Sequence, residues 1–378
     1  MPALTIAPPR TWNELSSEVQ SRTDRQVYPM TGMRSEDVRE ILSNIKSLDR
    51  DEWGRAWSAM GERWMAQATS KEKSDPKGAA DDHIMAWRYF GFGAWPCQNS
   101  ADKQKAYDRC VVAFENYGRL QSPPIETVRI PFEGKEIVCY VQLPANKPAP
   151  VVLTIGGLDS YKEYTAERYG PVYMAHGMGY VALDAPGTGH APLKADIDSE
   201  RFYSAVIDYL LTRRDVDPNR IGLQGVSTGG YWATKMAYRE PKRLKCVVNW
   251  AGPADLFFTQ DYQAKVFGTR EYLFDFGPAQ FSVYGVDTMD EYLARVAKMS
   301  IKTQGLLDKP APPLLLVNGE RDTVAPIEDL HIILRNGPTP KTAWVNPIGW
   351  HLARSAEWND ERIMREVIVR WLADHLRA

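Results

Sequence analysis

The sequence has 378 residues, 44% of them hydrophobic and 25% charged, which is the composition of an ordinary globular protein. The net charge is −2 and the basic and acidic residues are interspersed, which argues against nucleic acid or a membrane surface as a partner. The length predicts two to three domains, or one large domain with an appendage.

Targeting signals are not evident in the sequence. Residues 1–9 lack a basic region followed by a long apolar core, so we expect no signal peptide, and no apolar run approaches the length of a transmembrane helix. The four cysteines are scattered without a C-x-x-C pair, which is typical of buried free thiols in a reducing compartment. We therefore expect a cytoplasmic protein.

The first 120 residues have helical character. Residues 1 to about 35 show no clear period and are predicted to be an arm or a surface-packed extension. From Ser35 onward apolar residues fall at helical spacing, and a tryptophan-rich stripe that includes Trp53 and Trp57 repeats every three or four residues. Such a stripe is more often core than a cofactor contact. Residues 1–120 are therefore predicted to form a helical N-terminal domain.

The pattern changes at Ser122-Pro123-Pro124. Two alternating segments flank Glu133-Gly134 and predict a β-hairpin. Short apolar runs then alternate with helical stretches; these runs are residues 151–155, 180–184, 221–224, 244–250 and 313–318. Alternation of this kind predicts an α/β fold, with a mostly parallel sheet covered by helices on both faces, over residues 121–378.

An aromatic-rich segment interrupts the alternation between residues 255 and about 308. Most of it has helical spacing. Because open α/β sheets bind ligands beyond the C-terminal ends of their strands, an insertion at this point is predicted to lie over the ligand site.

The stretch Gly225-Val226-Ser227-Thr228-Gly229 matches the G-x-S-x-G pattern of a nucleophile elbow. A serine in a strained turn needs neighbours without a Cβ, so that the strand and the following helix can approach each other closely. The bare pattern is weak because glycine and serine are common in loops, so its context has to decide.

That context is a Ser…Asp…His order along the chain. Ser227, Asp322 and His351 each follow a predicted strand, and this is the order of the α/β-hydrolase triad. A serine hydroxyl is a poor nucleophile alone, so His351 is expected to accept its proton and Asp322 to orient the imidazole. Glu320 is the rival acid; we favour Asp322 because it lies further into the loop.

An oxyanion hole is also required. We expect it to combine the N–H of Thr228, the residue after the nucleophile, with an amide of the Gly156-Gly157-Leu158 loop, from either Gly157 or Leu158. Three charged residues that follow this loop, Asp159, Lys162 and Glu163, are interpreted as residues at the rim of the site rather than as part of its chemistry.

Together these motifs resemble the α/β-hydrolase family over residues 122–378. The helical extension, Gly156–Glu163, Asp184–Gly189 and the elbow resemble in particular the group of FrsA-like esterases, fungal yellowish-green pigment-pathway hydrolases and 2,6-dihydroxypseudooxynicotine hydrolase. The resemblance implies that the helical extension and the insertion form a cap over the triad. It also implies that some members cleave carbon–carbon bonds next to a ketone.

Substrate contacts are less specific in the sequence than the triad. The candidates are Asp159, His190, Asp255, Phe258 and Tyr262, and a cap carboxylate of the kind that some members use could be Asp255 or Asp261. We expect a small hydrophobic or aromatic substrate. The resemblance also allows a homodimer through the helical extension.

The sequence thus predicts a serine hydrolase that cleaves an acyl bond, with a carbon–carbon bond slightly favoured. An ester, thioester or lactone remains open, as does direct attack by water with Ser227 only polarising the carbonyl. An acyltransferase or a ligand-binding protein on the same fold is the alternative of another class. No cofactor or metal is expected, because there is no H-E-x-x-H, no P-loop and no complete dinucleotide fingerprint.

Overall fold

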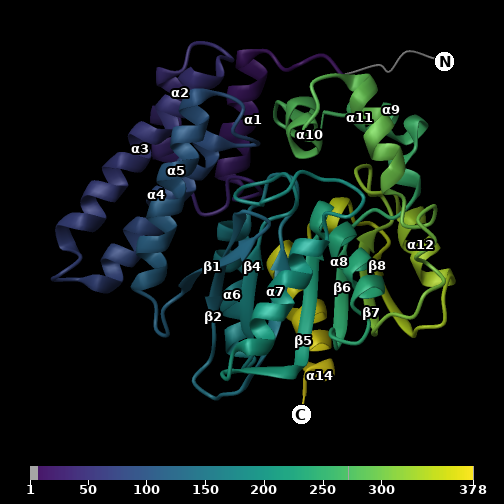
Figure 1. Ribbon diagram of the computed structural model, residues 1–378. Coiled ribbons are helices and arrows are strands. Elements are labelled where there is room, and N and C mark those ends of the chain that lie inside the picture. Colours follow the sequence, from purple (N-terminus) through teal and green to yellow (C-terminus); the bar gives the residue numbers. More distant parts are fainter. Residues whose placement is uncertain (1–6, 271, 378) are drawn as a thin grey trace. The chain divides into compact units, whose positions relative to one another are not determined.

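A computed structural model describes residues 7–270 and 272–377. The chain divides into two compact units (Figure 1). The first, which we call the helical unit, comprises Met1–Glu126 and Phe267–Ala279, and the second, the sheet unit, comprises Thr127–Val266 and Gln280–Ala378.

The described part of the helical unit contains five helices before the first strand. They are α1 (Trp12–Asp24), α2 (Ser35–Asn44), α3 (Arg50–Lys71), α4 (Pro76–Ala94) and α5 (Ala101–Arg119). The side chains of Asp49, Asp75 and Ser100 accept hydrogen bonds from the first-turn N–H groups of α3, α4 and α5 and so define where each helix begins. Helices α3, α4 and α5 pack against one another, and α1 packs on α2.

An aromatic cluster forms the core of this unit. Trp53, Trp57 and Met60 of α3 are buried, as the helical stripe predicted. The ring of Trp57 meets that of Phe92 edge to face, with centroids 4.6 Å apart. The interpretation of the stripe as core is therefore confirmed.

Helix α1 lies in the region where the sequence showed no clear period and an arm or surface-packed extension was predicted. Thr11 and Glu14 form a reciprocal capping box at its start, and Leu15, Val19 and Thr23 recur every four residues on its buried face. The capping box and the four-residue spacing are both short patterns among polar residues, so they do not stand out in the sequence. The first six residues of the predicted arm lie outside the described residues.

The segment Phe267–Ala279 belongs to the helical unit although its neighbours in sequence belong to the sheet unit. The Asp275 carboxylate accepts hydrogen bonds from Arg50 Nε at 2.8 Å and from Asn99 Nδ2 at 2.9 Å. The Phe274 ring contacts the rings of Trp53 and Trp95. The boundaries expected from sequence placed this segment in the catalytic domain; its aromatic and ionic contacts account for the difference.

The sheet unit is built on eight strands. They are β1 (Glu126–Phe132), β2 (Lys135–Gln142), β3 (Ala149–Ile155), β4 (Gly179–Leu183), β5 (Val216–Val226), β6 (Cys246–Trp250), β7 (Leu314–Gly319) and β8 (Lys341–Asn346). Their order is β1-β2-β4-β3-β5-β6-β7-β8. Strand β2 runs antiparallel to β4, and all pairs from β4 to β8 are parallel. The predicted mostly parallel sheet is confirmed.

Helices cover the sheet. Helix α6 (Lys162–Ala175) packs on β3 and β4, α7 (Arg201–Thr212) on β5, α8 (Thr228–Arg239) on β5 and β6, and α12 (Ile327–Arg335) on β7. The chain closes with α13 (Asp360–Ile363), the π-helical turn η4 (Met364–Ile368) and α14 (Val369–His375), which contacts β6. In Figure 1 the closing helices, in yellow, pass behind the strands, whereas α7 lies in front of them.

The segment between β6 and β7 is mostly helical, as predicted. It contains η1 (Leu256–Phe258), α9 (Gln260–Phe267), α10 (Phe276–Tyr284), α11 (Met289–Val296) and η2 (Ala297–Met299). The buried Asp329 carboxylate of α12 accepts hydrogen bonds from the N–H groups of Ala254, Leu256 and Phe257 and so fixes the start of this segment.

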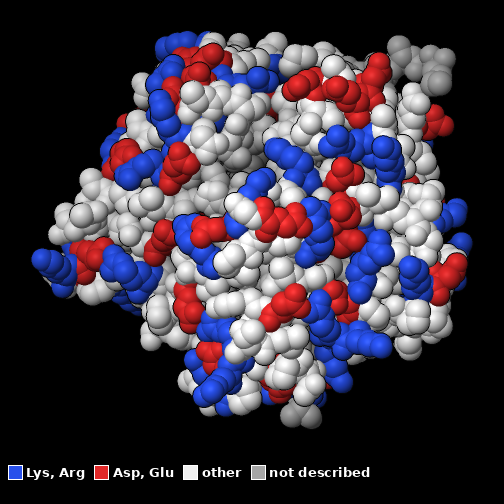
Figure 2. Space-filling model, viewed as in Figure 1, with Lys and Arg blue, Asp and Glu red and all other residues white. Residues whose placement is uncertain are grey.

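The surface and the cysteines agree with the composition. On the face shown in Figure 2, basic and acidic side chains are intermixed rather than segregated. All four cysteines are buried. Among the described helices, none is long and apolar enough to cross a membrane.

Candidate active site

Ser227 lies at the sharp turn between β5 and α8. Its backbone has φ 53° and ψ −121°, a strained conformation for a residue with a side chain. The turn closes because its flanking residues are glycines: a Cβ on Gly225 would lie 2.0 Å from the Gly229 carbonyl oxygen, and one on Gly229 would lie 2.3 Å from the Gly156 oxygen. The expected nucleophile elbow is therefore present as a backbone structure.

Asp322 follows β7 and is directed at the histidine. Its side chain is fully buried, and its Oδ1 accepts hydrogen bonds from the N–H groups of Val324 at 2.8 Å and Ala325 at 3.0 Å. Its Oδ2 lies 2.8 Å from His351 Nδ1. The rival acid, Glu320, is exposed. The structure thus brings Asp322 to the histidine.

His351 connects the carboxylate to the serine. Its Nε2 lies 3.0 Å from Ser227 Oγ. Since an ionised Asp322 can only accept, Nδ1 carries the proton and the Nε2 lone pair faces the hydroxyl. The imidazole is 17% exposed. The three residues form a continuous hydrogen-bonded chain from a buried carboxylate to a hydroxyl.

The loop that carries His351 is held firmly in place. Leu352 and Ala353 both adopt left-handed backbone conformations, with φ of 62° and 63°. Trp250 Nε1 donates to the Leu352 carbonyl oxygen at 2.9 Å, and Asn346 Nδ2 donates to that of Ala353 at 2.8 Å. These side-chain bonds compensate the unfavourable backbone and fix the direction of the imidazole.

The two expected oxyanion donors differ in how they are engaged. Thr228 is the first residue of α8, where the N–H groups have no intrahelical acceptor. The Gly157 N–H instead donates to Ser160 Oγ at 2.8 Å, so it is occupied within its own loop. Of the two amides that the sequence left open, Leu158 is the one that this bond does not engage.

The other predicted substrate contacts have varied environments. Asp255 Oδ1 accepts a short hydrogen bond from Ser300 Oγ, and Lys302 Nζ lies 3.5 Å from its Oδ2. The Phe258 ring is buried against Tyr231 and Phe257.

The remaining candidates are partly or fully exposed. Tyr262 is half-buried and its ring lies near Lys265 Nζ, whereas Asp261 is exposed. Asp159 is half-buried directly after Leu158. His190 Nδ1 lies 3.2 Å from Lys162 Nζ.

Lys162 and Glu163 correct a prediction. They were expected at the rim of the site, but their side chains are 0% and 2% exposed. Lys162 Nζ lies 2.7 Å from Glu163 Oε1 and 3.1 Å from Asp184 Oδ2. Burial alone would lower the pKa of Lys162, but the Asp184 and Glu163 carboxylates raise it above its ordinary value. The signal in the sequence that could have indicated this burial is Asp184, an acidic residue that directly follows the next strand, β4.

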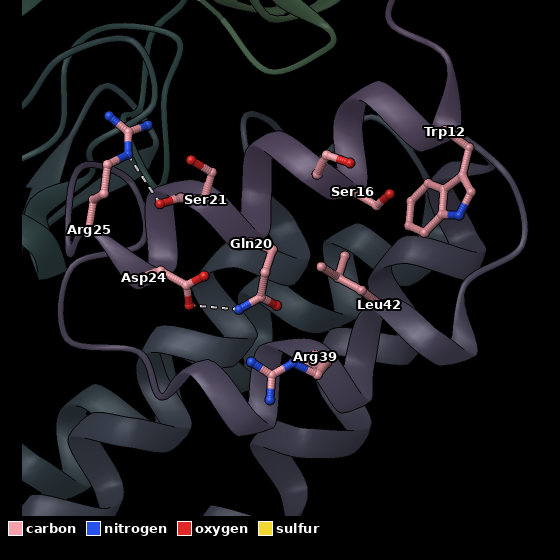
Figure 3. Close-up of a pocket in the computed structure, with 9 residues that line it drawn as sticks. Trp12, Ser16, Gln20, Ser21, Asp24, Arg25, Arg39 and Leu42 are labelled. Atoms are coloured by element: carbon pink, nitrogen blue, oxygen red, sulfur yellow. Dashed lines mark hydrogen bonds between the residues drawn. The ribbon is translucent and has the colours of Figure 1, made fainter.

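A groove in the helical unit has a different character (Figure 3). It encloses about 590 Å³ along α1 and α2 and is lined by Trp12, Ser16, Ser17, Gln20, Ser21, Asp24, Arg25, Arg39 and Leu42. Gln20 Nε2 donates to Asp24 Oδ1 at 2.9 Å, and Arg25 Nε donates to the Ser21 carbonyl oxygen at 3.2 Å. Several of its polar groups thus bond to one another along α1.

Within the described ranges there is no cluster of His, Cys, Asp and Glu suited to a metal ion.

Comparison with known proteins identifies the family. The model of the FrsA-like esterases matches residues 18–364. The chain belongs to the FrsA-like esterase family. It is therefore an α/β-hydrolase and a hydrolytic enzyme, with the helical N-terminal region and the mostly parallel sheet described above.

Individual relatives agree with this assignment. The chain is 29% identical to 2,6-dihydropseudooxynicotine hydrolase of Paenarthrobacter nicotinovorans over 69% of this chain and 70% of that protein. It is 25% identical to Esterase FrsA of Photobacterium profundum over 78% of this chain and 70% of that protein. The solved structure of 2,6-dihydroxy-pseudo-oxynicotine hydrolase superposes with a TM-score of 0.78 at 25% identity, covering 91% of this chain and 93% of the other.

Proposed function

We propose that Ser227, His351 and Asp322 are the catalytic triad of a serine hydrolase. The observation that carries this proposal is the hydrogen-bonded chain from Asp322 through His351 to Ser227, with distances of 2.8 and 3.0 Å. It starts at a buried carboxylate and ends at a hydroxyl on a strained elbow, which is the arrangement that activates a serine.

The first chemical step joins Ser227 to the substrate. The Oγ attacks a carbonyl carbon while its proton passes to His351 Nε2, and the imidazolium is stabilised by the Asp322 carboxylate. The carbonyl oxygen becomes an oxyanion, which the N–H groups of Thr228 and Leu158 would stabilise. When the tetrahedral intermediate collapses, the bond to the leaving group breaks and His351 returns the proton to that group. Water then hydrolyses the acyl-enzyme with His351 as the base.

The nature of the leaving group decides the substrate class. We favour cleavage of a carbon–carbon bond next to a ketone in an aromatic or polyketide-like substrate, because the similarity to the 2,6-dihydroxy-pseudo-oxynicotine hydrolase structure extends over 91% of this chain. The leaving group is then a carbanion, so a ketone or phenol in the substrate must delocalise its charge. Ester hydrolysis is the alternative that the relationship to Esterase FrsA supports.

A matched panel of β-diketones and esters with the same acyl group tests the reaction class. We expect turnover of at least one aromatic β-diketone, with the ester of the same acyl group turned over more slowly. If every ester were cleaved faster than the matching β-diketone, ester hydrolysis would replace carbon–carbon cleavage as the favoured reaction.

A fluorophosphonate probe tests the nucleophile: we expect a covalent adduct on Ser227, and folded protein that forms none would refute the covalent mechanism.

A further inference from the structure

A buried ionic cluster lies at the end of the loop that carries Leu158. It joins Lys162 and Glu163, at the start of α6, with Asp184, which directly follows β4. The Tyr140 hydroxyl of β2 donates to Glu163 Oε1 at 3.1 Å, and the Lys162 ammonium lies 5.4 Å from the centroid of the Tyr140 ring. The cluster therefore connects β2 and the end of β4 to the start of α6.

Asp184 links two loops through one carboxylate. Its Oδ1 accepts the Lys162 backbone N–H at 2.8 Å, and its Oδ2 accepts the His190 N–H at 2.9 Å as well as the Lys162 ammonium at 3.1 Å. The loop that contains His190 approaches so closely that a Cβ on Gly189 would lie 2.5 Å from Asp184 Oδ2. The loops after β3 and after β4 are thus held by the same group.

The loop between β3 and Lys162 has little freedom. A Cβ on Gly156 would lie 1.7 Å from the Ser160 carbonyl oxygen, and the Gly157 N–H donates to Ser160 Oγ at 2.8 Å. The loop begins at a strand end and finishes at the cluster, with Leu158 between. A Cβ on Gly157 would lie 3.4 Å from Ser227 Cβ, so the loop passes directly beside the serine.

The composition of the cluster indicates a purpose other than stability. Buried ion pairs are weak contributors to folding because desolvation of the charges offsets their attraction. This cluster also leaves Glu163 Oε2 buried without a hydrogen-bond partner among the described residues. Burial, the largest influence, raises the pKa of Glu163. An apolar contact would hold α6 on the sheet, but it would not set the direction of the Lys162 N–H.

We propose that Lys162 is a positioning residue that, through Asp184, holds the Leu158 amide where the oxyanion forms. The proposal rests on the proposed function, since it assumes that Ser227 generates an oxyanion beside this loop. Lys162 itself need not touch the substrate. Its removal should leave the binding of the ground state intact and slow the chemical step.

The test uses the full chain and a fluorophosphonate probe, because phosphonylation of Ser227 also develops charge on an oxygen in the oxyanion hole. The dependence of the labelling rate on probe concentration separates the rate constant of the chemical step from the dissociation constant of the reversible complex. The labelled fraction at completion gives the proportion of competent protein. Since each rate is taken per labelled site, partial unfolding lowers only that fraction.

Lys162→Met is the principal variant and Lys235→Met is its matched control. Lys235 is also 0% exposed and lies 3.0 Å from a buried carboxylate, that of Glu200, but it lies on α8 and not at the loop after β3. We expect Lys162→Met to slow the chemical step about 10- to 100-fold with the dissociation constant changed less than about twofold. Lys235→Met should leave both constants unchanged.

A second variant, Asp184→Asn, covers the case in which Lys162→Met does not fold. The amide can still accept the Lys162 N–H but places a donor toward the ammonium, so it should also slow the chemical step. A chemical rate within about twofold of wild type in either labelled variant would overturn the proposal, as would failure of both variants to fold, which would assign the cluster to stability. Absence of labelling in the wild-type protein would instead refute the proposed function.

Discussion

Two buried lysines, one in each unit, have pKa values shifted in opposite directions. Lys103 of the helical unit and Lys162 of the sheet unit are both 0% exposed. Burial lowers the pKa of Lys103 to about 8, and the Asp275 carboxylate, 3.7 Å from its Nζ, only partly offsets this effect. The pKa of Lys162 is raised, since two carboxylates lie at 2.7 and 3.1 Å.

Lys235 shows which factor decides the direction. It lies 3.0 Å from Glu200, closer than Lys103 is to Asp275, and burial still lowers its pKa. One carboxylate therefore does not compensate for the loss of water around these ammonium groups, whereas two do. The buried Lys162 cluster of the sheet unit adjoins the loop that passes the serine, whereas the core of the helical unit is an aromatic cluster. Substitutions in the two units should accordingly affect different quantities.

The largest expected effect is on turnover and comes from Ser227→Ala. Removal of the nucleophile should lower kcat by at least about 10⁴-fold on the substrate identified by the panel, because the triad acts as one unit. The free energy of unfolding should change by less than about 1 kcal/mol, since only a partly exposed hydroxyl is lost. Steady-state kinetics and urea denaturation measure the two quantities. Wild-type turnover in this variant would refute the assignment of Ser227.

The helical unit should show the reverse pattern with Trp57→Ala. Trp57 is fully buried and contacts the rings of Trp53 and Phe92, so its truncation should lower the free energy of unfolding by about 3–5 kcal/mol. Urea denaturation followed by circular dichroism measures the change. Leu48→Ala is the control in the same unit, because Leu48 is 46% exposed and should change stability by less than about 0.5 kcal/mol. Equal effects of the two variants would contradict the aromatic core.

The depressed pKa of Lys103 predicts how stability depends on pH. Between pH 8 and 10.5 the unfolded chain holds a proton on this lysine that the folded chain has released, so the unfolding free energy should rise as the pH rises through this window. The expected gain is about 3 kcal/mol relative to Lys103→Met, which has no group to titrate. Urea denaturation of both proteins at pH 7.5, 9 and 10 measures it. Parallel pH profiles for the two would show that Lys103 titrates normally.

The features that could be predicted from the sequence are those that local patterns determine. Runs of buried residues indicate strands wherever they occur, and a serine between glycines at a strand end allows few backbone conformations. The structure brings Ser227, Asp322 and His351 together because parallel strands end at the same edge of a sheet.

Contacts between distant parts of the chain could not be predicted in this way. The bond from Asp275 to Arg50 spans 225 residues, and no local pattern marks either partner. The burial of Lys162 depends on Tyr140 of β2 and on Asp184, which directly follows β4, and both are distant from Lys162 in sequence. Two adjacent charged residues at the start of a helix, such as Lys162 and Glu163, are expected to be exposed unless the residues at the neighbouring strand ends are known.

Helix α1 differs from these cases, because a local signal for it, the Thr11–Glu14 capping box, is present in the sequence but is short. The smallest effect we predict tests that signal. The Thr11 side chain accepts from the Glu14 N–H, and Glu14 Oε2 in turn accepts from the Thr11 N–H at 2.8 Å. Thr11→Ala should lower the free energy of unfolding by about 1 kcal/mol, because it leaves a first-turn N–H of α1 without its side-chain acceptor.

Thr288→Ala is the matched control for that cap. Thr288 forms the same capping box with Glu291 at the start of α11, in the sheet unit. If the caps act locally, the two variants should lose similar amounts of stability in denaturation experiments, and neither should change the rate at which Ser227 is labelled. A slower labelling rate in Thr11→Ala alone would show that the helical unit influences the chemical step, and the separation of stability from chemistry between the two units would then fail.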